Sequence, residues 1–209
     1  MSSILETDII QDGIRFRSRD HSYTHIETGV RLASVSEVIS TVYAKKSWDG
    51  VSPEIVETAK IRGIAVDYWM TRYLREGSIT IEGESYDVRD RVNVAVRIFE
   101  SQFAGLQAET QKIVFSLDDL VAGMVDFWID GRIVVDLKNT YSTEKGWLLQ
   151  LGAYCTYVPQ PVERCGVLHV SPKVYKQGGM WIEYDVELCR SYWRAAVEWW
   201  KLTRQFGKR

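Results

Sequence analysis

Three charged residues, Asp126, Asp136 and Lys138, interrupt two neighbouring apolar segments, residues 121–129 and 133–138. Apolar and charged residues alternate through both segments, which is typical of half-buried β-strands. Carboxylate oxygens are ligands that Mg²⁺ and Mn²⁺ prefer, and such a metal polarises a phosphodiester and lowers the pKa of a bound water. A nearby lysine supplies a compact positive charge for the attacking water or the transition state. The trio therefore predicts phosphodiester hydrolysis. The alternative is an Asp–Lys surface pair, because the tripeptide D-x-K is common.

The connection between the two segments decides whether the three charges share a face. The odd-numbered positions of both segments are apolar, and burying them together places the three charged residues on one common face. A two-residue Asp-Gly turn would instead pair Asp126 with Val135 and divide the charges between faces. The pattern therefore predicts a three-residue loop around Asp130-Gly131, with Gly131 in a left-handed conformation.

Three sequence patterns around the trio resemble the PD-(D/E)XK nuclease superfamily, and its RecB-type exonuclease branch with the phage recombination exonucleases in particular. They are G-x-x-D ending at Asp126, D-L-K at residues 136–138, and Q-L-G-A-Y at residues 150–154. The N-terminal runs F-x-x-x-D-H-S-Y and A-S-V-S-E-V-I resemble the same branch. The likeness implies that Asp126 and Asp136 are metal-binding carboxylates and that the Leu137 backbone carbonyl is a third ligand. It implies that Lys138 is the catalytic lysine. It also implies that Gln150 and Tyr154 are the Q-x-x-x-Y pair, on one helix face.

Two further acidic residues extend the implied site. The segment R-G-I-A-V-D-Y, residues 62–68, is similar to an R-G-x-x-x-H motif in which the histidine faces the metal, and Asp67 stands in the histidine position. Aspartate is also a hard oxygen ligand, so the resemblance implies a metal ligand here with a different metal preference. The alternative is a solvent-facing helix residue. Glu109 matches an acidic strand position that supports the metal ions or their waters in related exonucleases, with a plain exposed glutamate as the alternative.

The resemblance implies Mg²⁺ or Mn²⁺ as cofactor, two ions in all. The three cysteines, Cys155, Cys165 and Cys189, are scattered, odd in number and never arranged as C-x-x-C. This spacing argues against a disulfide framework and against zinc. It also excludes the four-cysteine iron–sulfur cluster that some RecB-type nucleases carry.

The composition is that of an ordinary globular protein. The 209 residues are 45% hydrophobic, and 26 basic against 28 acidic residues give a formal charge of −2. Because the net charge of the chain is slightly negative, the chain as a whole does not attract nucleic acid, and DNA has to be bound by local basic patches. No apolar run is long enough to cross a membrane, and the first residues lack the pattern of a signal peptide. We therefore expect no membrane association and a cytoplasmic location, in a bacterium or a phage-infected host.

Periodicity and capping signals predict the elements that position these residues. A β-hairpin-like N-terminal segment is expected over residues 8–32, followed by helices over 34–42, 52–75 and 86–103. In the last of these helices, Arg91 is expected on the solvated face. Strands are expected over 108–116, 121–129 and 133–138, then a helix capped by Ser142 or Thr143 and ending near Val158. A strand with His169 as a packed residue, a hairpin partner and an aromatic helix from Glu187 to Phe206 complete the chain. Tryptophans of that helix are expected in the core, although one exposed ring would be able to stack on an unpaired base.

This order predicts a mixed α/β fold with the restriction-endonuclease-like core α-β-β-β-α-β expected of the superfamily. We expect one nuclease domain over residues 1–209: an N-terminal hairpin and helical part (1–105), the catalytic sheet (106–186) and a C-terminal helix (187–209).

The leading functional hypothesis is a metal-dependent DNA nuclease, most simply a RecB-like exonuclease of phage or mobile-element recombination and repair. DNA is the expected partner, with a recombinase, a single-strand annealing protein or a helicase as candidate protein partners and a homo-oligomer as a candidate assembly. One alternative is a non-catalytic DNA-binding or assembly module with a degenerate site, suggested by the missing histidine. Another is an endonuclease, against which the Q-x-x-x-Y helix argues.

Overall fold

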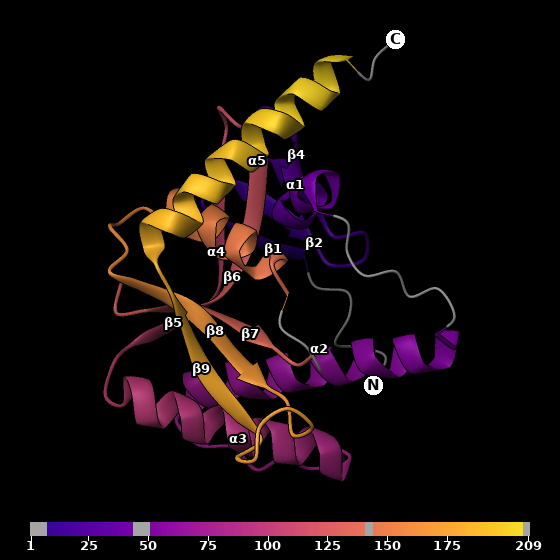
Figure 1. Cartoon of the computed structure of the whole chain (residues 1–209), viewed down its shortest axis with the longest axis vertical. Coiled ribbons are helices and arrows are strands. Elements are labelled where there is room, and N and C mark those ends of the chain that lie inside the picture. The colour runs from indigo at the N-terminus through magenta and orange to yellow at the C-terminus, as the bar shows by residue number, and fades with distance from the viewer. Residues whose placement is uncertain (1–7, 44–50, 141–143, 207–209) are drawn as a thin grey trace.

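A mixed β-sheet of nine strands runs through the molecule, and five helices pack on its two faces (Figure 1). The structure is a computed structural model that describes residues 8–43, 51–140 and 144–206, and these counts refer to that part of the chain. The elements in chain order are β1 (Asp8–Gln11), β2 (Ile14–Arg17), β3 (Ser22–His25), β4 (Arg31–Ser34), α1 (Val35–Val42), α2 (Pro53–Glu76), α3 (Tyr86–Phe103), β5 (Ala108–Ser116), β6 (Val121–Ile129), β7 (Ile133–Lys138), α4 (Gly146–Tyr157), β8 (Arg164–Val170), β9 (Gly179–Tyr184) and α5 (Val186–Phe206).

The strand order is β1-β2-β3-β4-β6-β7-β8-β9, with β5 also paired to β6. Strands β1 to β4 form an antiparallel meander, which is the N-terminal hairpin expected from the sequence with further strands added. Helix α4 crosses from β7 to the parallel strand β8. The run α3-β5-β6-β7-α4-β8 is the predicted α-β-β-β-α-β core, so the mixed α/β fold class is confirmed.

Strand β6 carries a fork in the sheet. Strand β5 pairs with β6 along one edge over its whole length. On the other edge, β4 pairs only with Val121 and Ala122, and β7 pairs only with residues 127–129. Within the described chain, residues 123–126 therefore face no strand on that edge. On that edge the β-ladder does not use the backbone groups of these four residues.

Different helices cover the two faces of the sheet. Helices α1, α4 and α5 pack on one face, where the buried residues include Trp147, Leu151, Trp193 and Trp200. Helices α2 and α3 pack on the other face, where Met70 and Phe99 meet Phe127 and Leu168. Figure 1 shows α2 and α3 side by side, away from α4 and α5. In the described parts of the chain, no helix is both long and apolar enough to cross a membrane.

The predicted loop between β6 and β7 is confirmed. Ile129 pairs with Ile133, so three residues form the connection, and Phe127 pairs with Val135 as the parity argument required. Gly131 is left-handed with a φ of 68°, and Asp130 is left-handed as well, with a φ of 52°.

The expectation of one regular apolar face on β6 is wrong. Val121 and Val125 pack with α4 and α5, whereas Phe127 and Ile129 pack with α3 on the opposite side. The alternation shifts between Val125 and Phe127, at Asp126, because the strand loses one partner strand and gains another there. The charged residues therefore meet at a fork rather than along one regular sheet face.

Most predicted helix ends agree with the structure. Ser34 caps α1 by accepting the Glu37 N–H at 3.0 Å, and α2 begins at Pro53 and ends at Glu76, with Gly77 as its C-cap at a φ of 77°. Helix α4 starts later than expected, at Gly146, with Lys145 at the cap position. The caps expected there, Ser142 and Thr143, lie outside the described residues.

Candidate active site

Asp126 lies at the fork between β6 and β7. The ladder of these strands ends at the pair Phe127–Val135. Two residues beyond Val135 on β7, the Leu137 backbone N–H donates to Oδ2 of Asp126 at 2.7 Å. The aspartate side chain thus satisfies a backbone donor that the ladder no longer pairs. This bond fixes the carboxylate beside the second half of β7, where Asp136 and Lys138 lie.

Asp136 and Lys138 form a close ion pair inside the site. The side chain of Asp136 is 1% exposed, and its Oδ2 lies 2.6 Å from Nζ of Lys138, which is 20% exposed. The other oxygen of Asp136, Oδ1, is buried and accepts no hydrogen bond from an N–H group of the described residues, and the Asp126 carboxyl group is the neighbour that can donate to Asp136 when protonated. A buried carboxylate oxygen without a donor is costly, so this atom is suited to a cation.

More carboxyl groups than lysines belong to this cluster, so the single ammonium of Lys138 does not neutralise them all. Burial, then the charge of Asp136 and that of Asp67, raise the pKa of Asp126 well above its usual range. Burial also raises the pKa of Asp136, although Lys138 opposes the effect. Burial alone would lower the pKa of Lys138, but the charges of Asp136 and Asp126 outweigh it and raise that pKa. The raised pKa of Lys138 keeps it an ammonium ion, and a bound metal cation would oppose the upward shifts in the pKa of the aspartates.

Asp67 reaches the same pocket from helix α2. Burial and the charge of Asp136 raise the pKa of Asp67 to about 6, against opposing effects of a hydrogen bond from Gln111 and the charges of Lys138 and Arg75. The residue in the histidine position therefore belongs electrostatically to the cluster and is not a solvent-facing helix residue.

Gln111 is the residue of β5 that faces this cluster. The β5–β6 register places Gln111 opposite Asp126, and its backbone is left-handed, with a φ of 56°. Arg75 donates to Oε1 of Gln111 at 3.5 Å and to Oγ1 of Thr110 at 2.8 Å. Because its oxygen faces Arg75, the amide nitrogen of Gln111 is the group that donates to Asp67. A non-glycine residue with positive φ inside a strand stores strain, which is frequent at functional sites.

The structure does not bring Glu109 into the cluster. Its side chain is 60% exposed and lies 3.3 Å from Lys112. Residues three apart on a regular strand point to opposite faces, so this ion pair shows that the alternation shifts at Gln111. The sequence could not reveal this, because nothing in A-E-T-Q-K marks the left-handed residue.

Gln150 and Tyr154 lie one helical turn apart on α4, as their spacing predicted, and Gln150 Nε2 donates to the Tyr154 hydroxyl at 2.7 Å. Burial, followed by the charges of Asp136 and Asp126, raises the pKa of Tyr154 well above its usual range, so its hydroxyl keeps its proton. Gly123 permits this approach, because a Cβ there would lie 2.9 Å from the Tyr154 ring and 2.7 Å from Val35. The glycine of the G-x-x-D pattern thus makes room for the tyrosine of the Q-x-x-x-Y pair.

Tyr23 of β3 is a further neighbour of the site. It is fully buried, and burial, then the charge of Asp126, raise its pKa. It ends the N-terminal run D-H-S-Y, so the resemblance of that run was the available signal.

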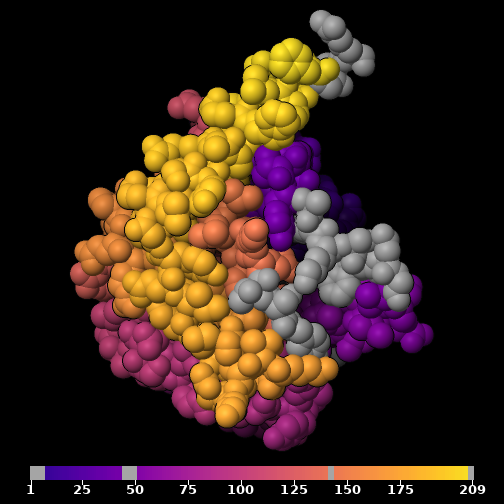
Figure 2. All heavy atoms as spheres, in the orientation of Figure 1, coloured from indigo at the N-terminus to yellow at the C-terminus, as the bar shows by residue number. Residues whose placement is uncertain are grey.

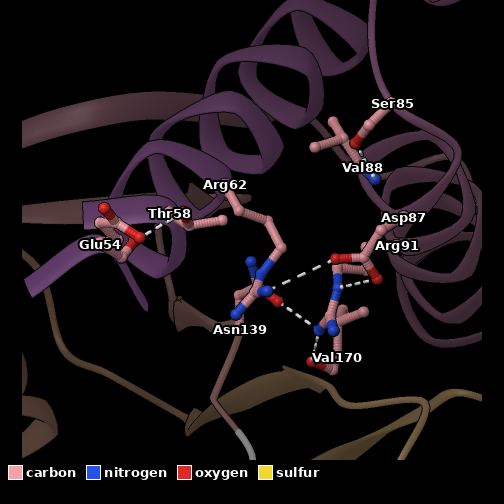
Figure 3. Close-up of polar contacts among 9 residues, drawn as sticks. All are labelled: Glu54, Thr58, Arg62, Ser85, Asp87, Val88, Arg91, Asn139 and Val170. Carbon is pink, nitrogen blue, oxygen red and sulfur yellow. Dashed lines mark hydrogen bonds and ion pairs between the residues drawn. The ribbon is translucent and has the colours of Figure 1, made fainter. Parts of the chain in front are cut away.

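A buried arginine network anchors the end of β7 just beyond Lys138 (Figure 3). Arg91 of α3 donates to Asp87 at 2.9 Å, to the Val170 carbonyl at 3.3 Å and to Oδ1 of Asn139, and Arg62 of α2 lies 3.5 Å from Asp87. The expectation that Arg91 belongs to a solvated face is wrong: it is 1% exposed. It is buried because it satisfies polar groups of α3, β7 and β8 together.

The residues fit a divalent cation in chemical type. The cluster offers hard carboxylate oxygens, one of them buried without an N–H donor, and an excess of acidic groups over lysine. In the chain as described, no three histidine, cysteine, aspartate or glutamate side chains lie close enough together to hold a metal by themselves. A bound ion would therefore be held by fewer protein carboxylates, with water or backbone oxygens as further ligands, as Mg²⁺ tolerates.

Comparison with solved structures finds proteins that resemble this chain in fold. No protein-family model matches the chain, and no curated protein sequence matches it. A candidate exonuclease from Eubacterium rectale superposes with a TM-score of 0.50 at 14% identity, over 80% of this chain and 77% of the other. The alkaline exonuclease LHK-Exo from Laribacter hongkongensis gives a TM-score of 0.41 at 10% identity, over 85% of this chain and 94% of the other, and its complex with dAMP gives 0.42. The first likeness shows that this chain and that protein share a fold.

Proposed function

We propose that this protein is a divalent-metal-dependent DNA nuclease whose active site is the fork between β6 and β7. The observation that carries the proposal is the environment of Asp136. Its Oδ1 is buried without an N–H donor, Nζ of Lys138 lies beside its Oδ2, and its charge acts on Asp126 and Asp67. A structural ion pair needs one carboxylate for one lysine, whereas the charge of Lys138 acts here on three carboxyl groups, those of Asp136, Asp126 and Asp67.

In this proposal Asp126, Asp136 and the Leu137 carbonyl hold Mg²⁺ or Mn²⁺, and Asp67 adds a further carboxyl group beside them. When bound, the metal supplies Lewis-acid activation of the phosphate and a water of lowered pKa. The Lys138 ammonium orients the attacking water or neutralises the charge that develops on the phosphate oxygens. The Tyr154 hydroxyl accepts from Gln150 and keeps its own proton, which it would donate to the bound phosphate, and Gln111 orients Asp67.

The direct test is incubation of the purified protein with end-labelled linear DNA and with circular DNA, in Mg²⁺, in Mn²⁺ and in EDTA. Metal-dependent loss of the linear form alone supports an exonuclease. Nicking or linearisation of the circle supports an endonuclease. Absence of cleavage in both metals, with DNA binding retained, contradicts the proposal.

A non-catalytic DNA-binding module is the second candidate function. It is favoured by the ion pair that occupies Oδ2 of Asp136 and by the lack of a preformed three-residue metal site among the described residues. In that case Asp136→Asn would leave DNA affinity unchanged in both the presence and the absence of metal.

The biological setting we propose is recombination or repair in a phage or mobile element, in the cytoplasm of the host cell. DNA is the proposed substrate, and a recombinase, a single-strand annealing protein or a helicase the proposed partner. The support is the sequence likeness of the Q-x-x-x-Y helix and the N-terminal run to RecB-type exonucleases. Co-purification of such a partner with the tagged protein from infected cells would test this setting.

A further inference from the structure

Lys138 is the last residue of β7 that a partner strand holds. The ladder between β7 and β8 ends at the pair Lys138–His169, and Asn139 and Thr140 lie beyond it. Past the end of a ladder, side chains have to take over the hydrogen bonds that hold the backbone in place. The position of the lysine therefore depends on the side chains that hold these two following residues.

Asn139 is held from the face of the sheet that α3 covers. Nη1 of Arg91 donates to Oδ1 of Asn139 and also to the Val170 carbonyl at 3.3 Å. Nε of the same arginine donates to Asp87 at 2.9 Å, which fixes the guanidinium on its own helix. Figure 3 shows Arg91 reaching from α3 to the ends of the two strands. Arg91 thereby ties the residue after Lys138 to the last residue of β8.

Thr140 is held by His169 on the face that α4 covers. Nε2 of His169 lies 2.9 Å from the Thr140 carbonyl, and Nδ1 lies 2.8 Å from the Tyr175 hydroxyl. Because a carbonyl can only accept, Nε2 carries the proton and donates it, and Nδ1 of the neutral ring accepts from Tyr175. The ring is fully buried, and its centroid lies 5.0 Å from that of Trp147 of α4. Burial lowers the pKa of His169, although the bond to Thr140 opposes this effect, so the ring stays neutral.

The turn that carries Tyr175 is itself held on α3. It spans residues 171–178, between β8 and β9, and the Gly178 N–H donates to the Tyr175 carbonyl at 2.9 Å within it. Arg97 of α3 donates to the Gln177 carbonyl. Figures 1 and 2 show this turn against α3 at the lower end of the view. Helix α3 therefore supports the histidine as well as the asparagine.

We propose that Arg91 and His169 are positioning residues for Lys138. Each fixes one of the two residues that follow the lysine, and together they hold its ammonium 2.6 Å from Oδ2 of Asp136. The inference rests on the proposed function, in which this ammonium acts on the attacking water or on the phosphate. Both side chains are buried, so neither contacts DNA, and their loss is expected to lower kcat without weakening DNA binding.

Two amide substitutions separate the two bonds of His169. The side-chain nitrogen of glutamine lies about where Nε2 of histidine lies, so His169→Gln keeps the donor to Thr140. The nitrogen of asparagine lies about where Nδ1 lies, so His169→Asn loses that donor. We expect kcat to fall roughly 10–100-fold in His169→Asn but to stay within about a factor of three of the parent in His169→Gln, with KM for DNA unchanged in both. Equal kcat values in the two folded variants would overturn the proposal, because a purely stabilising histidine needs no particular ring nitrogen.

Arg91→Lys tests the arginine. Lysine keeps the positive charge beside Asp87 but lacks the planar fork that bonds Asp87 through one nitrogen and Asn139 through another, so we expect kcat lowered roughly tenfold. Tyr157→Phe is the matched control, because it removes a buried hydrogen bond of 2.7 Å to Asp119, at the turn between β5 and β6. Its kcat should stay within about a factor of two. A raised KM at the parental kcat in Arg91→Lys would assign the arginine to DNA binding and overturn the proposal.

Hydrogen–deuterium exchange of the metal-free chain tests the positioning role without any cleavage. We expect faster exchange in a peptide spanning residues 136–140 for His169→Asn and Arg91→Lys, and parental exchange for His169→Gln and Tyr157→Phe. This measurement separates two failures. If the parent chain cleaves no DNA, the proposed function fails, and the exchange pattern still decides whether the two residues hold this segment. Parental exchange at residues 136–140 in both His169→Asn and Arg91→Lys would overturn the positioning role whether or not the chain is a nuclease.

Discussion

The carboxylate of Asp126 accepts the backbone N–H of Leu137 at 2.7 Å, across the fork where β6 and β7 separate. The bond replaces a ladder hydrogen bond with a side-chain one, so a proposed metal ligand also holds the strand that carries Asp136 and Lys138. The proposed metal ligation and the position of β7 therefore depend on the same residue.

This coupling predicts different effects for two substitutions at Asp126. Asp126→Asn keeps an oxygen that can accept the Leu137 N–H, so we expect lost cleavage with little change in melting temperature. Asp126→Ala leaves that N–H without an acceptor, so we expect an additional loss of about 1–3 kcal/mol in the free energy of unfolding. Denaturant titration of both variants beside a cleavage assay checks this, and equal stability of the two would show that the bond contributes nothing.

Asp136 and Lys138 are predicted to be essential to cleavage. We expect Asp136→Asn and Lys138→Met each to reduce the cleavage rate by roughly 10²–10³-fold or more, because each removes a charge that the reaction uses. Glu163→Gln is the matched control, since Glu163 forms a surface ion pair with Arg132 and its side chain is 61% exposed. Its rate should stay within about a factor of two. Cleavage by Asp136→Asn at the parental rate would show that the fork is not the active site.

Gln111 and Glu109 give a comparison within one strand. Gln111→Leu removes the donor to Asp67 and the acceptor for Arg75, so we expect a cleavage rate lowered by at least tenfold and a higher Mg²⁺ concentration for half-maximal rate. Glu109→Gln should change little, because its carboxylate faces Lys112 and solvent. Steady-state rates over a series of Mg²⁺ concentrations distinguish the two. A larger loss in Glu109→Gln would restore the role that the family resemblance implies.

The pKa of Asp67 predicts a pH dependence of stability in the metal-free protein. In the folded state this pKa is raised from 3.8 to about 6, so between these values the folded state binds more protons than the unfolded state. The contribution of Asp67 is therefore most favourable below pH 4 and is lost as the pH rises through about 6. We expect Asp67→Asn to gain stability relative to the parent over this window, by on the order of 2 kcal/mol. Parallel unfolding curves in EDTA from pH 4 to pH 8 measure this, and a constant difference between the two proteins would contradict it.

Gly123 is predicted to be intolerant of a side chain. Gly123→Ala places a Cβ at 2.7 Å from Val35 and 2.9 Å from the Tyr154 ring, so we expect a loss of about 1–3 kcal/mol and lower activity. Val35→Ala in the same chain should recover part of the stability. Gly63→Ala in α2 is the control, because no atom lies within 4 Å of its Cβ, and it should stabilise by about 0.5–1 kcal/mol. A neutral Gly123→Ala would show that Tyr154 can move away without cost.

The sequence by itself determined the elements and the identity of most candidate residues. Alternation and capping gave the strands that carry Asp126 and Asp136 and the helices that carry Asp67 and Gln150, because these signals act over a few residues. Parity also determined the three-residue loop at Gly131, since side-chain direction on a strand has a period of two.

Only the tertiary structure decided which of these residues meet. The fork in the sheet arises because β4 and β7 share one edge of β6, a pairing between segments about ninety residues apart that no local pattern encodes. The left-handed Gln111 directs its own side chain, and not that of Glu109, toward Asp67. The burial of Arg91 depends on polar groups of Asn139 and Val170, which lie far along the chain. Chemistry could be inferred from residue types, whereas the membership of the site depended on long-range packing.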